Sequence, residues 1–248
     1  MINTFPKIAT KCLFLTVYMR KFFIFSLVFI LLISMFSSCK QESVDMSGFW
    51  EFYKGKLAMF QEENQEYTHK TVDAVFLGDS LTDGYDVKSY YPEYTVLNRG
   101  IGGDTTIWLE KRLDVSLYSV KTKVAIMLIG ANNMETMFEN YQRILQSFKE
   151  NVPKTKIILL SLTSMGGEWG KKNQLAAYNN VKIKKLAEQY GFEFVDLYSA
   201  LLNLEDGEIF DEYTTDGGHL TPKGYEVLTN CIKPVLQKQI DIWENENN

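Results

Sequence analysis

The sequence predicts a three-layer α/β/α domain in which helices cover both faces of a mostly parallel sheet of about five strands. Short uncharged apolar segments alternate along the chain with longer segments that have helical periodicity. Strands that are apolar along their whole length are typical of parallel sheets buried on both faces. With 46% hydrophobic and 23% charged residues, the 248-residue chain has the composition of a globular protein. Its length is sufficient for one such domain and an additional segment at one end.

The individual elements follow from this alternation. Strands are expected at 72–77, 94–97, 124–129, 156–162 and 192–197, and the uncharged run 124–129 (VAIMLI) is the clearest of them. Helices are expected at 49–67, 105–118 with Thr105 as the N-cap, 135–152, 172–190, and from about Pro222 onward. Functional side chains of such sheets gather at the carboxyl ends of the strands. We therefore expect them directly after a strand or in the last loop.

The first forty residues differ from the rest of the chain. Residues 22–36 carry no charge, Arg20 and Lys21 precede them, and Ser-Ser-Cys at 37–39 follows. A basic start, an apolar centre and small residues at the end are typical of a secretory signal peptide. The apolar run is shorter than the roughly 20 residues that a membrane-spanning helix needs.

This segment resembles a bacterial lipoprotein signal, which implies that Cys39 becomes the lipidated residue. Phe36 stands where such signals usually have leucine, and Met19 is a possible alternative start of translation. An uncleaved anchor helix is the other interpretation. Both predict an exported protein that is held at a membrane, with its folded domain on the periplasmic or cell-surface side.

Charge and cysteine content limit the partners. The formal net charge is -5, so nothing suggests a nucleic acid partner. Residues 1–39 hold four basic and no acidic residues, so their cleavage would leave a more acidic body, compatible with neutral sugars or small esters. Beyond Cys39 the only cysteine is Cys231, expected to be a buried small hydrophobic residue. With two histidines and no CxxC motif, no metal site and no cofactor are expected.

One of the two histidines stands in a setting that suits catalysis. His219 lies in the segment 215–222 (TDGGHLTP), directly before a helix whose N-cap would be Thr221. Asp216 on the same loop can hold one imidazole nitrogen and stabilise the charged form of the ring. A surface turn rich in aspartate and glycine is the alternative. His69, in a polar link before the first strand, is not expected to be functional.

A histidine base needs a nucleophile, and Ser80 follows the first predicted strand. A serine hydroxyl is a weak nucleophile unless a base lies beside it. The G-x-S-x-G nucleophile elbow is absent because Thr82 occupies its last position. The alternative for Ser80 is a turn or helix N-cap, a role that Asp79 could also fill.

Acyl transfer also needs hydrogen-bond donors for the developing oxyanion. Segment 98–104 (NRGIGGD) is expected to follow the second strand, and its glycines let backbone N–H groups approach a ligand. Segment 130–133 (GANN) follows the third strand, and either asparagine could direct an amide at the same point. A phosphate cradle is the alternative, but neither the G-x-G-x-x-G spacing nor a P-loop lysine is present.

Segments 78–81 (GDSL), 98–105 (NRGIGGDT), 130–133 (GANN) and 216–219 (DGGH) resemble, in this order, the four signature blocks of the GDSL or SGNH hydrolases. The resemblance spans about 72–236 and implies the SGNH/flavodoxin-like fold. It implies Ser80 as nucleophile, His219 as base, Asp216 as acid, and an oxyanion hole made of Ser80, Gly103 and Asn132. Asn133 stands where the family usually has aspartate. A similar Asn-Asn pair occurs among relatives that resemble platelet-activating-factor acetylhydrolase. That position is expected to support the loop.

The resulting prediction is a signal peptide at 1–39, a tether and N-terminal helix at 40–70, and a hydrolase domain at 71–242. The family includes carbohydrate O-deacetylases, lysophospholipases and thioesterases. Export and an acidic body favour short-chain acyl esters, above all acetyl groups on a glycan. The glycine-rich loop 163–170 carries Trp169, which could contact a sugar or an acyl group or be plain surface. A lysophospholipase or thioesterase is one alternative, and a surface lipoprotein that binds glycan without turnover is another.

Overall fold

The computed structural model describes residues 47–247, and the fold below is that of the compact unit Phe49–Asn248. The predictions for the signal peptide, Cys39 and the start at Met19 lie outside the described residues. Between residues 47 and 247, no helix combines the length and the apolar character that crossing a membrane requires.

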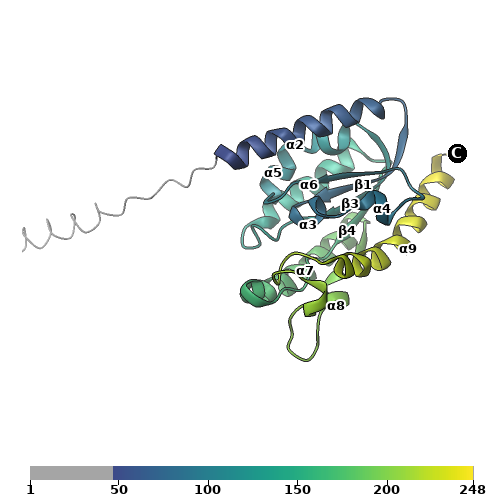
Figure 1. Ribbon diagram of the computed structural model, residues 1–248. Helices are drawn as coiled ribbons and strands as arrows, with labels where there is room; N and C mark the ends of the chain where they lie inside the picture. Colours follow the sequence, from purple (N-terminus) through teal and green to yellow (C-terminus); the bar gives the residue numbers. More distant parts are fainter. Residues whose placement is uncertain (1–46, 248) are drawn as a thin grey trace, which may run out of the picture. The chain divides into compact units, whose positions relative to one another are not determined.

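The core is a five-stranded sheet in the order β2-β1-β3-β4-β5, with every neighbouring pair parallel (Figure 1). The strands are β1 Thr71–Gly78, β2 Val96–Gly100, β3 Lys121–Leu128, β4 Lys156–Leu160 and β5 Glu193–Val195. The carboxyl-terminal halves of β1 and β3 are completely buried, which explains why they are apolar without alternation. The predicted fold class is confirmed.

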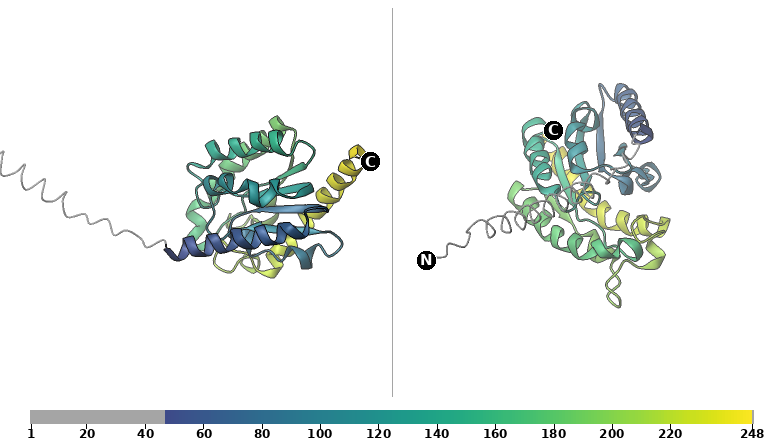
Figure 2. Two further views of the ribbon diagram at one scale, coloured as in Figure 1. Left: turned by 90° about the horizontal axis from the view of Figure 1, so that it is seen from above. Right: turned by 90° about the vertical axis from the view of Figure 1, so that its left-hand side faces the viewer.

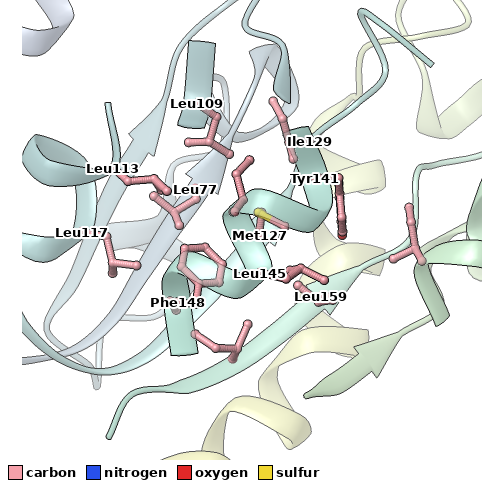
Figure 3. Packing of buried hydrophobic residues seen from close by; sticks show 14 of the residues in the cluster. Leu77, Leu109, Leu113, Leu117, Met127, Ile129, Tyr141, Leu145, Phe148 and Leu159 are labelled. Atoms are coloured by element: carbon pink, nitrogen blue, oxygen red, sulfur yellow. The ribbon is translucent and has the colours of Figure 1, made fainter. Parts of the chain in front are cut away.

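Helices cover both faces of this sheet (Figure 2). On one face, α5 Thr106–Lys111, the π-helix Asp114–Tyr118, α6 Met137–Asn151 and α7 Asn173–Tyr190 enclose a core that includes Leu77, Met127 and Phe148 (Figure 3). On the other face lie α3 Ser80–Asp83, α4 Val87–Tyr90, α8 Leu197–Leu201 and α9 Pro222–Asn247. A smaller cluster joins α2 Ser47–Glu66 to Ile101.

Several boundaries differ from the sequence prediction. β2 begins at Val96 and runs to Gly100, so Asn98 and Arg99 belong to the strand and not to the loop after it. Arg99 is fully buried because its guanidinium pairs with Glu63 of α2, a partner that periodicity cannot reveal. The helices α3, α4 and α8 were not expected, since four or five residues are too few to show a helical period.

The segment 105–118, expected as one helix, is two. Thr105 caps α5 as predicted by accepting a hydrogen bond from the Trp108 N–H. The α-helix then ends at Lys111, and a π-helix follows from Asp114. Two 3-10 helices, Gly167–Lys172 and Asp211–Tyr213, lie in the loops after β4 and before α9.

Candidate active site

Ser80 is the first residue of α3, directly beyond the end of β1. Asp79 caps this helix through its Oδ1, which accepts a hydrogen bond of 3.1 Å from the Leu81 N–H. A side chain at Gly78 would collide with the Leu128 carbonyl and the Thr82 side chain, so the tight passage from strand to helix requires glycine. Ser80 is thus held in a fixed position and remains partly accessible to solvent.

His219 links Ser80 to Asp216. Its Nε2 lies 3.1 Å from Ser80 Oγ, and its Nδ1 lies 2.7 Å from Asp216 Oδ2. An ionised carboxylate can only accept, so Nδ1 donates its proton to Asp216 and the neutral ring leaves Nε2 free to accept from the serine hydroxyl. Two motifs far apart in the sequence therefore supply three residues of one hydrogen-bonded chain.

Asp216 is fixed as a carboxylate by the loop that it begins. Its Oδ1 accepts the backbone N–H groups of His219 at 2.7 Å and of Gly218 at 2.9 Å. Backbone and side-chain hydrogen bonds from His219 lower the pKa of Asp216 to about 2. This carboxylate therefore stays charged throughout the pH range in which a histidine acts as a base.

The loop after β4 supports the histidine loop. The Gly166 N–H donates to the Gly217 carbonyl at 2.9 Å, and a side chain at Gly217 would collide with Gly166. Gly217 also has φ +87°, a conformation that favours glycine. The Trp169 ring stands edge-on to the imidazole of His219, with 6.2 Å between ring centroids.

The candidate oxyanion donors lie on the loops after β2 and β3. Gly103 has φ +76° and is exposed. Within the part of the chain that the structure describes, the N–H groups of Ser80 and Gly103 donate no backbone hydrogen bond. Asn132 Nδ2 donates to the Asp104 carbonyl at 2.8 Å, which joins the two loops and leaves the second amide proton available.

The neighbouring Asn133 also joins the loop after β3 to the segment that follows Asp104. Its Oδ1 accepts the Thr106 N–H at 3.3 Å, and its Nδ2 donates to Thr106 Oγ1 at 2.9 Å. An aspartate could not make the second of these bonds in its ionised form, whereas asparagine supplies both a donor and an acceptor. The residue holds the start of α5, in agreement with a supporting position.

A sequence comparison identifies the family. The sequence model of the GDSL-like lipase/acylhydrolase family matches residues 76–227. The chain belongs to this family. One relative is the human isoamyl acetate-hydrolyzing esterase 1 homolog, 25% identical over 175 residues that cover 58% of this chain and 69% of that protein. The protein is therefore a carboxylic ester hydrolase, as the sequence predicted.

Solved structures of similar proteins have the same fold. A GDSL-like lipase from Bacteroides thetaiotaomicron has a TM-score of 0.63 at 22% identity, over 73% of this chain and 97% of that chain. An acetyl xylan esterase from Geobacillus stearothermophilus has a TM-score of 0.53 at 20% identity, over 70% of this chain and 95% of that chain. These likenesses establish the arrangement of the sheet and helices.

The sequence reasoning missed one buried residue of this GDSL site, Arg112. Its guanidinium donates to Asp104 Oδ2 at 2.7 Å, to the Arg99 carbonyl at 2.8 Å and to the Gly78 carbonyl at 3.0 Å. It thereby joins the ends of β1 and β2 to the residue after Gly103. No sequence signal identifies it, because charged residues surround it in an amphipathic segment and it resembles a surface arginine.

The remaining polar candidates are peripheral. His69 is exposed in the turn between α2 and β1. Cys231, expected to be buried, is only partly so because it lies at the margin of the α9 core, and burial raises the pKa of its thiol. Across residues 47–247, no group of three or more histidine, cysteine or acidic side chains could hold a metal ion.

The buried carboxyl of Asp79 should make the free energy of unfolding depend on pH. Burial raises the pKa of its carboxyl to about 7, and Oδ2 has no hydrogen-bond partner among the described residues. A carboxyl with a raised native pKa stabilises the fold below its unfolded pKa of about 3.9, and that contribution is lost as the pH rises through 7. Between pH 4 and pH 8, ionisation of Asp79 should lower the free energy of unfolding of the wild type by about 2–4 kcal/mol. The variant Asp79→Asn should lack this decrease.

Urea unfolding of both proteins at several pH values measures this difference. Because each protein is compared with itself across pH, the constant cost of inserting an amide cancels. Asp104, whose pKa burial also raises, is present in both proteins, so its own burial acts on both pH profiles. Equal pH dependence in the wild type and in Asp79→Asn would show that the Asp79 carboxyl does not titrate as described.

Proposed function

We propose that this GDSL protein is a serine esterase in which Ser80 is the nucleophile, His219 the general base and Asp216 the residue that orients the base. The observation that carries the proposal is the chain of hydrogen bonds from Asp216 through His219 to Ser80 Oγ, with 2.7 and 3.1 Å at its two links. These distances lie within the reach that base-assisted attack requires.

In the acylation step, Ser80 Oγ forms a bond to the ester carbonyl carbon while its proton passes to His219 Nε2. The carbonyl π-electrons move to oxygen, and the N–H groups of Ser80 and Gly103 and the Asn132 amide stabilise that oxyanion. Asp216 stabilises the resulting imidazolium. The intermediate then collapses, the ester C–O bond breaks, and His219 gives its proton to the departing alcohol.

Deacylation repeats the sequence with water as the nucleophile. His219 takes a proton from water, the hydroxyl attacks the acyl carbon, and Ser80 leaves after receiving the proton back. The products are one carboxylic acid and one alcohol, and the enzyme is restored. In these steps the chain supplies its own side chains and backbone N–H groups, and water is the second nucleophile.

Asn132→Ala should lower kcat about 10²–10³-fold, because one donor to the oxyanion is lost while the substrate ground state is little affected. The free energy of unfolding should change by no more than about 1 kcal/mol, since Asn132 is exposed and loses one hydrogen bond. Steady-state kinetics on p-nitrophenyl acetate measure kcat and KM separately. A tenfold rise in KM at unchanged kcat would contradict this role.

The substrate class that we propose is a short-chain acyl ester, foremost an acetyl ester on carbohydrate. Two comparisons support it: a human relative is named for isoamyl acetate hydrolysis, and the fold is shared with an acetyl xylan esterase. Trp169 is half-buried beside His219, so part of its aromatic surface is accessible on the side where the alcohol departs.

Hydrolysis of p-nitrophenyl acetate, butyrate and dodecanoate tests the acyl preference, and release of acetate from acetylated xylan tests the alcohol side. We expect acetate and butyrate to be cleaved and dodecanoate to be poor. A preference for dodecanoate would favour a lysophospholipase or thioesterase. No turnover of any ester, together with binding of the glycan, would favour the non-catalytic alternative.

We further propose that the protein is exported and held at a membrane by a lipid on Cys39. The support is the order of basic, apolar and small residues before that cysteine. Membrane fractionation of cells that produce the wild type or Cys39→Ser tests this. Loss of the variant from the membrane fraction is expected, and equal retention would indicate an uncleaved anchor helix.

A further inference from the structure

The amino-terminal half of α2 forms an aromatic cluster with α5. The Trp50 ring meets Trp108 edge-on with 4.6 Å between centroids, and Tyr53 lies 5.8 Å from Trp50. The Tyr53 hydroxyl donates to the Trp108 carbonyl at 3.3 Å. These contacts fix α2 against α5, which begins two residues after Asp104.

Two phenylalanines of α2 face the glycine loop that carries Gly103. Phe49 Cε2 is 3.3 Å from the position that a Cβ would occupy on Gly103, and Phe52 Cε1 is 3.8 Å from the equivalent position on Gly102. Phe49 is only partly buried, and 44% of Phe52 remains exposed. Gly103 is itself exposed, so apolar surface lies uncovered directly beside a proposed oxyanion donor.

A polar contact holds the same loop. Asp83 Oδ2 accepts the Gly102 N–H at 2.9 Å, and Asp83 Oδ1 pairs with Lys56 of α2. α2 therefore meets the loop directly through Phe49 and Phe52, and indirectly through Lys56, whose partner Asp83 binds the Gly102 N–H. The rings keep a fixed place relative to Gly103.

The strand order determines which part of an ester would meet these rings. Ser80 follows β1, the loop of Gly103 follows β2 on one side of it, and Trp169 follows β4 on the other side, where it packs against His219. The leaving alcohol must lie next to His219, which protonates it. The carbonyl oxygen accepts hydrogen bonds from the donors at Gly103 and Asn132. The acyl chain is then directed away from His219, toward the α2 side.

We propose that Phe49 and Phe52 form an acyl-binding surface, which accepts an apolar chain of a few carbons beyond the carbonyl. This inference rests on the proposed function, because it presumes that Ser80 is acylated. Phe49 and Phe52 lie outside residues 76–227, the part that matches the GDSL family, so this surface belongs to the additional amino-terminal helix. The fully buried members of the cluster, such as Tyr53, serve packing instead.

The test compares Phe49→Ala with Met59→Ala in the purified full-length protein. Met59 is 62% exposed on the same helix, ten residues or about 15 Å along it from Phe49, and therefore controls for the loss of an apolar side chain. For Phe49→Ala we expect kcat/KM on p-nitrophenyl butyrate to fall about tenfold more than on acetate, mainly through KM. Met59→Ala should leave both values within about twofold.

A third variant separates binding from support of the loop. Phe49→Leu keeps an apolar side chain and should retain most of the butyrate activity, which a role in recognising apolar carbons predicts. Equal decreases of kcat on acetate and butyrate in Phe49→Ala would mean that the ring only positions Gly103, and would overturn the proposal. Unchanged selectivity in a folded variant would overturn it as well.

Failure of the inference and failure of the proposed function give different results. If Ser80→Ala still hydrolyses both esters, the serine esterase is wrong and the acyl surface loses its basis. If hydrolysis depends on Ser80 but Phe49→Ala has the wild-type ratio of butyrate to acetate, only the acyl surface is wrong. A further set of substrates, acetyl esters of different alcohols, tests the alcohol side. Trp169→Ala should change the relative kcat/KM values within this set, and Phe49→Ala should not.

Discussion

Ser80→Ala is expected to lower kcat for p-nitrophenyl acetate by at least about 10⁴-fold, the largest effect predicted for this protein. Alanine removes the atom that forms the bond to the acyl carbon and leaves the remaining donors in place. Because Ser80 is only partly buried and its side chain bonds to His219, the free energy of unfolding should change by no more than about 1 kcal/mol.

His219→Gln provides the companion measurement. If Ser80 and His219 act as one unit, the double variant should be about as slow as either single variant, since removing the second member of a unit adds little. Additive losses in the double variant would contradict a shared step. The exposed Ser119, whose hydroxyl bonds to the Asp114 carbonyl, is the matched control for serine replacement, and Ser119→Ala should have wild-type kcat.

The second large effect concerns stability. Arg112→Met is expected to lower the free energy of unfolding by about 3–5 kcal/mol, because it leaves the buried Asp104 carboxylate without its partner. The variant should also lose kcat, since Arg112 joins Gly78, Arg99 and Asp104 around the loops that carry the oxyanion donors. Urea unfolding measures the first effect and ester kinetics the second.

Arg143→Met is the control for this experiment. Arg143 pairs with Glu110 and Glu139 on the surface, where solvent screens the ion pairs, so its replacement should cost far less stability than that of Arg112. The double variant Arg112→Met, Asp104→Asn should recover part of the lost stability, because no unpaired charge remains. A loss of stability in Arg112→Met no larger than that in Arg143→Met would contradict the description of this buried pair.

The layered fold was predictable because its physical causes are local. The carboxyl-terminal halves of β1 and β3 are buried on both faces, so these parts of their sequences are apolar without alternation. α6 shows a helical stripe because one side of it packs on the sheet. β2 was placed too early because Arg99, a charged residue within a strand, depends on the distant partner Glu63. No local pattern encodes that pairing.

The site was predictable to the extent that its residues carry chemistry within short motifs. Ser80 lies in one recognisable segment and Asp216 and His219 lie in another, and the structure brings the three together. Arg112 was missed because its role depends on carbonyl groups of two strands and a loop that are far apart in the sequence. Phe49 was expected only as part of a helical stripe. Its contact with Gly103 depends on where α2 packs.

The most direct test of the central claim is covalent labelling with a fluorophosphonate, followed by intact mass measurement and peptide mapping. These reagents react with a serine whose hydroxyl is activated by a neighbouring base. The account predicts one adduct per chain, located on Ser80, that disappears in Ser80→Ala and forms much more slowly in His219→Gln. An adduct on another residue, or no adduct in a preparation that hydrolyses p-nitrophenyl acetate, would contradict it.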